Sequence, residues 1–105
     1  MLIRARAPLR LGLGGGGTDL SPYCDTFGGA VLNATINLYA YATLEPLPGG
    51  DRVVFAASDT GASVDLDADA AAMDLLDPLI LHRAVYRHVV MNFREGRPFP
   101  CRLNT

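Results

Sequence analysis

Lysine is absent from the 105-residue sequence, and only two cysteines occur, Cys24 and Cys101. Nine arginines therefore carry all the side-chain cation charge, and the formal net charge is −2, which argues against a nucleic-acid binder that works by neutralising phosphates. Two cysteines so far apart form neither a disulfide framework nor a metal-binding spacing. We expect two reduced thiols in a cytoplasmic protein, and a bridge between them stays open as the alternative.

Long hydrophobic runs are also absent, so no membrane-spanning helix is predicted. The first residues contain Arg4 and Arg6 and lack the apolar stretch of a signal peptide. Half of the residues are nevertheless apolar and 19% are charged, which is a composition that can build a modest core. The length fits one small domain or a piece of a larger one.

Hydrophobic spacing predicts several strands and one long helix. Strands are predicted at 2–13, 30–47, 52–58, 62–66 and 99–105, and a helix at 78–95. Pro8 should mark a sheet edge, a bulge or a break between two short strands. The turn after 30–47 predicts an antiparallel hairpin with 52–58. Asp77 and Pro78 are a typical helix start, and Gly96 a typical end.

The predicted helix is amphipathic. Its core face should contain Leu81, Val85, Val89 and Phe93, with Tyr86 and a hydrogen-bonded His82 beside them. Its solvated face should contain Arg83, Arg87 and Arg94. Acidic residues concentrate just before this helix. Asp65, Asp67 and Asp69 are interpreted as part of a solvated face; a metal site is the sharper alternative, although the glycine and distal glutamate of a calcium loop are missing.

A glycine-rich stretch, 12–17, follows the first strand. It matches a dinucleotide fingerprint only formally, since Pro22 and the glycines at 28–29 prevent the required helix, and a P-loop needs a lysine. Four consecutive glycines indicate backbone with positive φ whose N–H groups can face an anion or hydroxyls. Asp19 could then accept bonds from sugar hydroxyls, with Thr18 as donor or acceptor and Arg10 as a nearby cation. A plain turn with Asp19 as a cap remains the alternative.

Three segments, 6–20, 27–36 and 81–87, resemble the GHMP kinases (galactokinase, homoserine kinase, mevalonate kinase and phosphomevalonate kinase). The stretch Gly-Gly-Gly-Thr-Asp-Leu-x-x-Tyr, followed by Phe-Gly-Gly-Ala, is most similar to the branch of D-glycero-D-manno-heptose 7-phosphate kinase. The resemblance implies an α+β fold with a mixed β-sheet backed by helices. Residues 1–105 would be the N-terminal part of the N-terminal domain, with the first motif present and the ATP-binding second and third motifs absent.

The resemblance also implies an ATP-dependent kinase that phosphorylates a sugar or sugar phosphate, with heptose 7-phosphate favoured. Its catalytic residue here would be Arg10, and its substrate-binding residues Gly15, Gly16, Gly17, Thr18 and Asp19. Galactokinases carry Glu and His where this chain has Gly16 and Gly17, which leaves room for a larger, phosphorylated sugar.

ATP and Mg²⁺ would serve the full-length enzyme, and we expect this fragment to bind neither and to be inactive alone. The expected partner is a small-molecule sugar, with no nucleic acid and no membrane, and exposed apolar surface could bring copies together as a homo-oligomer. The alternative function is a non-catalytic carbohydrate- or anion-binding module.

Overall fold

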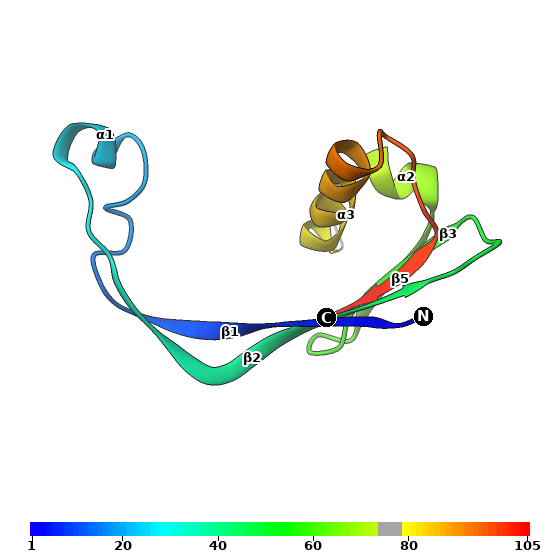
Figure 1. Ribbon diagram of the computed structural model, residues 1–105, viewed down its shortest axis with the longest axis horizontal. Coiled ribbons are helices and arrows are strands. Elements are labelled where there is room, and N and C mark those ends of the chain that lie inside the picture. The colour runs from blue at the N-terminus through cyan, green and yellow to red at the C-terminus, as the bar shows by residue number, and fades with distance from the viewer. Residues whose placement is uncertain (74–78) are drawn as a thin grey trace. The chain divides into compact units, whose positions relative to one another are not determined.

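The structure is a computed structural model that describes residues 1–73 and 79–105 of the chain (Figure 1). Its elements are β1 (Ile3–Gly14), α1 (Tyr23–Phe27), β2 (Leu32–Pro46), β3 (Arg52–Ala57), β4 (Ala62–Asp67), α2 (Ala68–Met73), α3 (Ile80–Phe93) and β5 (Cys101–Asn104). The strands form one mixed sheet in the order β1-β2-β5-β3-β4, which confirms the α+β class. The chain divides into two compact units: one combines residues 1–5 with 41–105, and the other is residues 6–40.

The last strand of the larger unit, β5, lies between β2 and β3. It runs antiparallel to β2, with Glu45 opposite Arg102, and parallel to β3, with Val53 opposite Cys101. The predicted hairpin between 30–47 and 52–58 is therefore wrong. The apolar positions of β5 explain the difference, because Cys101 is fully buried and a central strand gives it neighbours on both sides.

The hairpin of this unit instead joins β3 to β4 through the turn at 58–61. Arg52 on β3 contacts two carboxylates of β4, with Nε 2.9 Å from Asp65 and Nη1 2.8 Å from Asp67. These two hydrogen bonds raise the pKa of the arginine. All three side chains are about half exposed, so the pairs lie on a solvated surface, in agreement with the interpretation of the acidic segment.

The core of the larger unit lies between β3 and β5 on one side and α2 and α3 on the other (Figure 1). Phe55 is fully buried and meets the edge of the Tyr86 ring at 5.7 Å between centroids. The Tyr86 hydroxyl donates to the Phe99 carbonyl and accepts from the Phe99 amide, both at 2.9 Å. Helix α3 thereby holds the segment that leads into β5. The sequence had not predicted α2.

Helix α3 buries a different face from the predicted one. Its buried residues are Arg83, Tyr86 and Val90, whereas Leu81 is 72% and Phe93 75% exposed. Prediction of the core face was therefore wrong, as was the solvated position of Arg83. The spacing 83, 86, 90 is equally helical, and the aromatic contacts of Tyr86 decide which of two adjacent stripes faces the sheet.

The ends of α3 agree with the predicted ends only in part. The structure places the first helical residue at Ile80, after Leu79 with φ of +65°. The predicted start at Asp77 and Pro78 lies outside the described residues. At the other end the Gly96 amide donates to the Val90 carbonyl at 3.0 Å, which confirms the predicted stop. His82 is half-buried with Nε2 2.9 Å from the Thr105 hydroxyl, as predicted for a hydrogen-bonded histidine.

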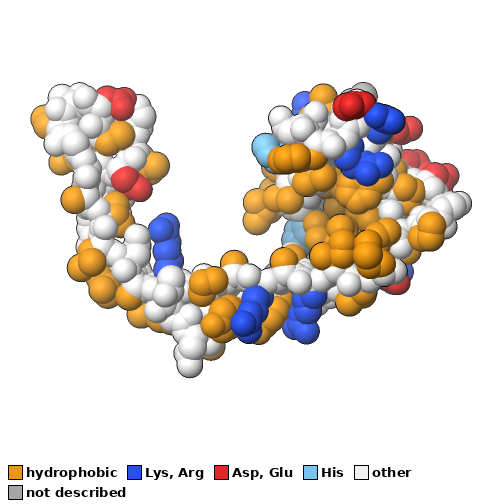
Figure 2. Space-filling model, viewed as in Figure 1, with side chains coloured by type: hydrophobic (Ala, Val, Ile, Leu, Met, Phe, Trp, Pro, Cys, Tyr) orange, Lys and Arg blue, Asp and Glu red, His pale blue; other side chains and the backbone are white. Residues whose placement is uncertain are grey.

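The smaller unit, residues 6–40, contains most of β1, the glycine-rich loop, α1 and the first part of β2. None of its side chains is fully buried, and most of its large apolar residues are exposed (Figure 2). These include Leu9, Leu11, Leu13, Leu20, Phe27, Leu32 and Leu38. The expected exposed apolar surface is thus confirmed, and association of copies through it stays a prediction. β1 lies at the sheet edge, as Pro8 predicts. None of the helices in the described ranges is long and apolar enough to cross a membrane.

The two cysteines are both free thiols, as expected. Burial raises the pKa of Cys101 from 9.0 to about 11, whereas Cys24 is only half-buried. At pH values between 9 and 11 the Cys101 thiol is deprotonated in the unfolded chain but still protonated in the folded one. The contribution of this thiol to the free energy of unfolding is therefore constant below about pH 9 and falls as the pH rises towards 11.

A small thiol-reactive compound at pH 8 should therefore modify Cys24 of the native protein at least about 100-fold faster than Cys101. The reactive species is the thiolate, and the buried Cys101 stays protonated at this pH. Timed labelling followed by peptide mass spectrometry measures both rates, with the denatured protein as control. Equal rates in the native protein would contradict the burial of Cys101.

Candidate functional site

The glycine-rich loop begins where β1 ends and makes two turns within the six residues 15–20. Gly15 and Gly17 have φ of +79° and +89°, values that side-chain-bearing residues rarely adopt. The Thr18 amide donates to the Gly15 carbonyl at 3.1 Å, and the Leu20 amide donates to the Gly17 carbonyl at 3.3 Å. The predicted positive-φ backbone is confirmed. Asp19 does not cap a helix, because the N-cap residue of α1 is Pro22 and no side chain caps this helix.

A second glycine-containing segment, residues 28–30, packs directly against this loop. A Cβ atom on Gly15 would lie 1.9 Å from the Ala30 carbonyl oxygen, and one on Gly29 would lie 2.1 Å from the Thr18 carbonyl oxygen. Both distances are far inside van der Waals contact, so the two backbones approach as only glycine permits. The contact between this segment and the loop was not predicted, because it joins residues that are 11 to 15 positions apart in the sequence.

The Thr18 side chain fastens the two segments together. Its hydroxyl lies 2.7 Å from the Gly15 carbonyl oxygen and 3.1 Å from that of Ala30, and it accepts a hydrogen bond from the Ala30 amide at 3.1 Å. A hydroxyl has one proton and two lone pairs, so these backbone groups use most of its capacity. Thr18 therefore holds the loop in place, whereas its predicted contact with substrate stays a prediction.

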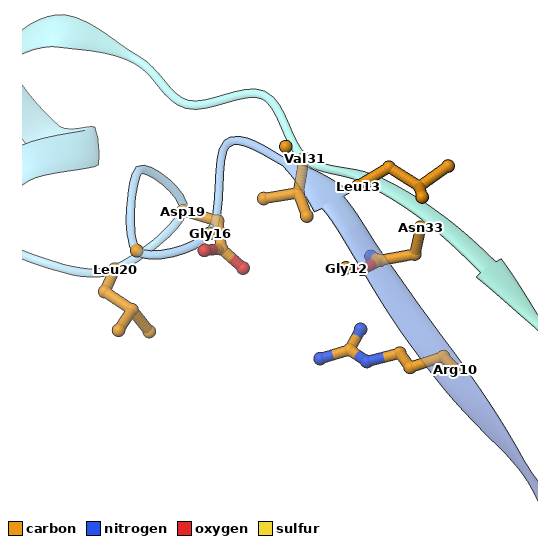
Figure 3. A pocket seen from close by; sticks show the side chains of 10 residues that line it. Arg10, Gly12, Leu13, Gly16, Asp19, Leu20, Val31 and Asn33 are labelled. Carbon is orange, nitrogen blue, oxygen red and sulfur yellow. The ribbon is translucent and has the colours of Figure 1, made fainter.

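A pocket of about 500 Å³ opens beside the loop (Figure 3). Of the predicted site residues, Arg10, Gly16, Gly17 and Asp19 line it, and Gly15 and Thr18 do not. Gly15 and Thr18 instead pack against Ala30. The loop thus has one side that contacts the protein and another that faces the pocket.

Two side chains of opposite charge, Arg10 and Asp19, line the pocket. Arg10 projects from β1 and Asp19 from the far end of the loop, and both side chains are exposed (Figure 3). In the part of the chain that the structure describes, neither side chain has a hydrogen-bond or ion-pair partner. A carboxylate accepts bonds from hydroxyls and a guanidinium binds phosphoryl oxygens, so the pair can hold a ligand that carries both groups.

The rest of the pocket lining consists of glycine backbone, which leaves open space, and of apolar side chains. Added Cβ atoms on Gly14, Gly16 or Gly17 would meet nothing within 4 Å, so this side of the pocket is bare backbone. Leu13, Leu20 and Val31 supply apolar surface. Within the described ranges, no group of three His, Cys, Asp or Glu side chains could hold a metal ion.

Solved structures of other proteins share this fold. No protein-family model matches the chain. The chain is 38% identical over 104 residues to D-glycero-alpha-D-manno-heptose 7-phosphate kinase of Campylobacter jejuni, a match that covers 98% of the chain and 30% of that kinase. A crystal structure of D-glycero-D-manno-heptose 1-phosphate kinase from Bacteroides thetaiotaomicron superposes with a TM-score of 0.83 at 36% identity, over 99% of the chain and 33% of that protein.

A mevalonate kinase of Methanococcus jannaschii shares the fold, with a TM-score of 0.75 at 10% identity over 99% of the chain and 32% of that protein. These relatives and neighbours are kinases of the GHMP type, which confirms the resemblance seen in the glycine motif. The two that share more than a third of their aligned residues with this chain are heptose phosphate kinases. The chain spans about a third of the length of each of these proteins.

Proposed function

We propose that this chain forms part of the sugar site of an ATP-dependent GHMP-type kinase that phosphorylates a sugar phosphate, with heptose 7-phosphate as the favoured substrate. The observation that carries the proposal is the pocket in which Arg10 and Asp19, both without protein partners in the described residues, lie beside a glycine loop. The two heptose phosphate kinases among the relatives support the same substrate class.

Both charged side chains of the pocket have a role in this reaction. The carboxylate of Asp19 accepts hydrogen bonds from hydroxyls of the sugar, and the loop glycines let the sugar approach the backbone. Arg10 stabilises negative charge on the phosphoryl group as it passes from ATP to a hydroxyl oxygen of the sugar. Phosphoryl transfer depends mainly on such positioning and electrostatic stabilisation. ATP and Mg²⁺ would be held by parts of the kinase outside these 105 residues, which should have no kinase activity alone.

The bare backbone at Gly16 and Gly17 supports a phosphorylated sugar over a smaller one. Side chains at these positions would occupy space that the pocket leaves open. The complete protein should accordingly turn over heptose 7-phosphate in preference to galactose. A clear preference for galactose would contradict the proposed substrate class.

Exchange of Asp19 for asparagine should lower kcat/KM of the complete protein for heptose 7-phosphate by about 100-fold, because a hydrogen bond between a hydroxyl and a carboxylate contributes about 2–3 kcal/mol. Asp51→Asn is the matched control, since Asp51 is exposed and lies outside the pocket. Steady-state kinetics at saturating ATP measure the change. Equal losses in both variants would refute the role of Asp19. Sugar-phosphate binding without any phosphoryl transfer by the wild-type protein would instead favour a non-catalytic binding module.

A further inference from the structure

A third polar side chain, that of Asn33 on β2, faces the same pocket. Figure 3 shows its amide group on the side of the pocket where Arg10 projects, with Asp19 across the open space. The side chain is exposed and, like Arg10 and Asp19, has no hydrogen-bond partner in the described part of the chain. Three polar groups without protein partners, from β1, the loop and β2, therefore converge on one space.

The neighbouring strand keeps this amide accessible through a glycine. A Cβ atom on Gly12 of β1 would lie 3.8 Å from the Asn33 side-chain oxygen, which is ordinary van der Waals contact. A side chain at position 12 would therefore begin in contact with the amide oxygen. Gly12 does not have positive φ. The backbone conformation therefore does not require glycine at position 12. Access to the Asn33 amide is a physical reason for a glycine at this position.

The chemistry of an amide fits a sugar that already carries a phosphate. An amide donates and accepts hydrogen bonds, as a sugar hydroxyl does, so the two can form a pair in either direction. It also carries no charge. A second carboxylate at this position would repel a phosphorylated ligand, whereas asparagine keeps Asp19 as the only anion among the described residues that line the pocket.

We propose that Asn33 is a further substrate-binding residue, whose side-chain amide hydrogen-bonds a hydroxyl of the sugar phosphate and orients the sugar between Arg10 and Asp19. This inference rests on the proposed function and adds a contact to it. Asp19 alone fixes one point of the sugar and leaves it free to rotate, whereas a second contact from β2 sets its orientation.

Binding measurements test this role directly. Isothermal titration of the complete protein with heptose 7-phosphate should give a dissociation constant about 10-fold higher for Asn33→Ala than for the wild type, because one neutral hydrogen bond is lost. Gly12→Val, which leaves Asn33 in place and covers its amide, should weaken binding to a similar extent. Asn92→Ala, on the exposed side of α3, is the matched control and should bind normally.

The charge argument has its own variant. Asn33→Asp keeps an acceptor and adds a negative charge, so it should weaken binding of heptose 7-phosphate more than binding of the unphosphorylated heptose. If Asn33→Ala binds as tightly as the wild type, the inference is overturned, and the proposed function is still supported by wild-type binding and turnover. If the wild type does not bind the sugar phosphate, both are overturned. If the wild type binds but does not turn over the sugar phosphate, and Asn33→Ala binds it more weakly, the role of Asn33 is supported and the kinase assignment is refuted.

Discussion

Replacement of Gly15 by alanine should reduce the affinity of the complete protein for its sugar phosphate by about 100-fold, although Gly15 does not line the pocket. The new methyl group would lie 1.9 Å from the Ala30 carbonyl oxygen, so the loop and the 28–30 segment must separate by more than an ångström. That movement breaks the bonds of the Thr18 hydroxyl and displaces Asp19. Misplacement of a binding group by about 1 Å typically costs about 100-fold.

The matched control is Gly49→Ala, in the turn between β2 and β3. Gly49 has φ of +80°, almost the same as Gly15, but an added Cβ there meets nothing within 4 Å. It therefore reports the cost of positive φ alone, about 1–2 kcal/mol of stability, with no effect on the pocket. Titration calorimetry and circular dichroism on both variants separate the two effects. Normal sugar-phosphate binding by a folded Gly15→Ala protein would show that the contact between the two glycine segments does not position Asp19.

The local features of this site could be predicted from the sequence. Consecutive glycines predict positive φ, which the structure confirms at Gly15 and Gly17. The strand before the loop follows from residue types, and β1 is observed there, whereas the short helix α1 after the loop was not predicted. Residues 10 to 19 are close in sequence, so Arg10 and Asp19 could be expected near the same pocket, whereas the contact with residues 28–30 that holds the loop could not.

Contacts between distant segments could not be predicted in this way. The packing of residues 28–30 on the loop and the position of Asn33 depend on how β2 pairs with β1, which local composition does not specify. The same limit explains the wrong hairpin. The turn at 46–50 is a normal hairpin signal, but β5 pairs with both β2 and β3 and separates them.

Phe55→Ala should lower the free energy of unfolding by about 3–5 kcal/mol, the largest loss of stability that we expect from a single side chain of this fold. Phe55 is fully buried between the sheet and α3, where it contacts Tyr86 and lies near His82. Truncation leaves a cavity that the two rings cannot fill without moving. Denaturant unfolding followed by circular dichroism measures the loss.

Phe93→Ala is the matched control, because it removes the same side chain from a position that is 75% exposed. We expect a change within about 0.5 kcal/mol. The pair of variants also distinguishes the two stripes of α3, since the hydrophobic spacing of the sequence places Phe93 in the core, whereas the structure buries Arg83 and Val90 on either side of Tyr86. A loss of several kcal/mol at Phe93 with little change at Phe55 would show that the helix buries the stripe of Leu81, Val85 and Phe93, and the packing of α3 on β3 and β5 described above would be wrong.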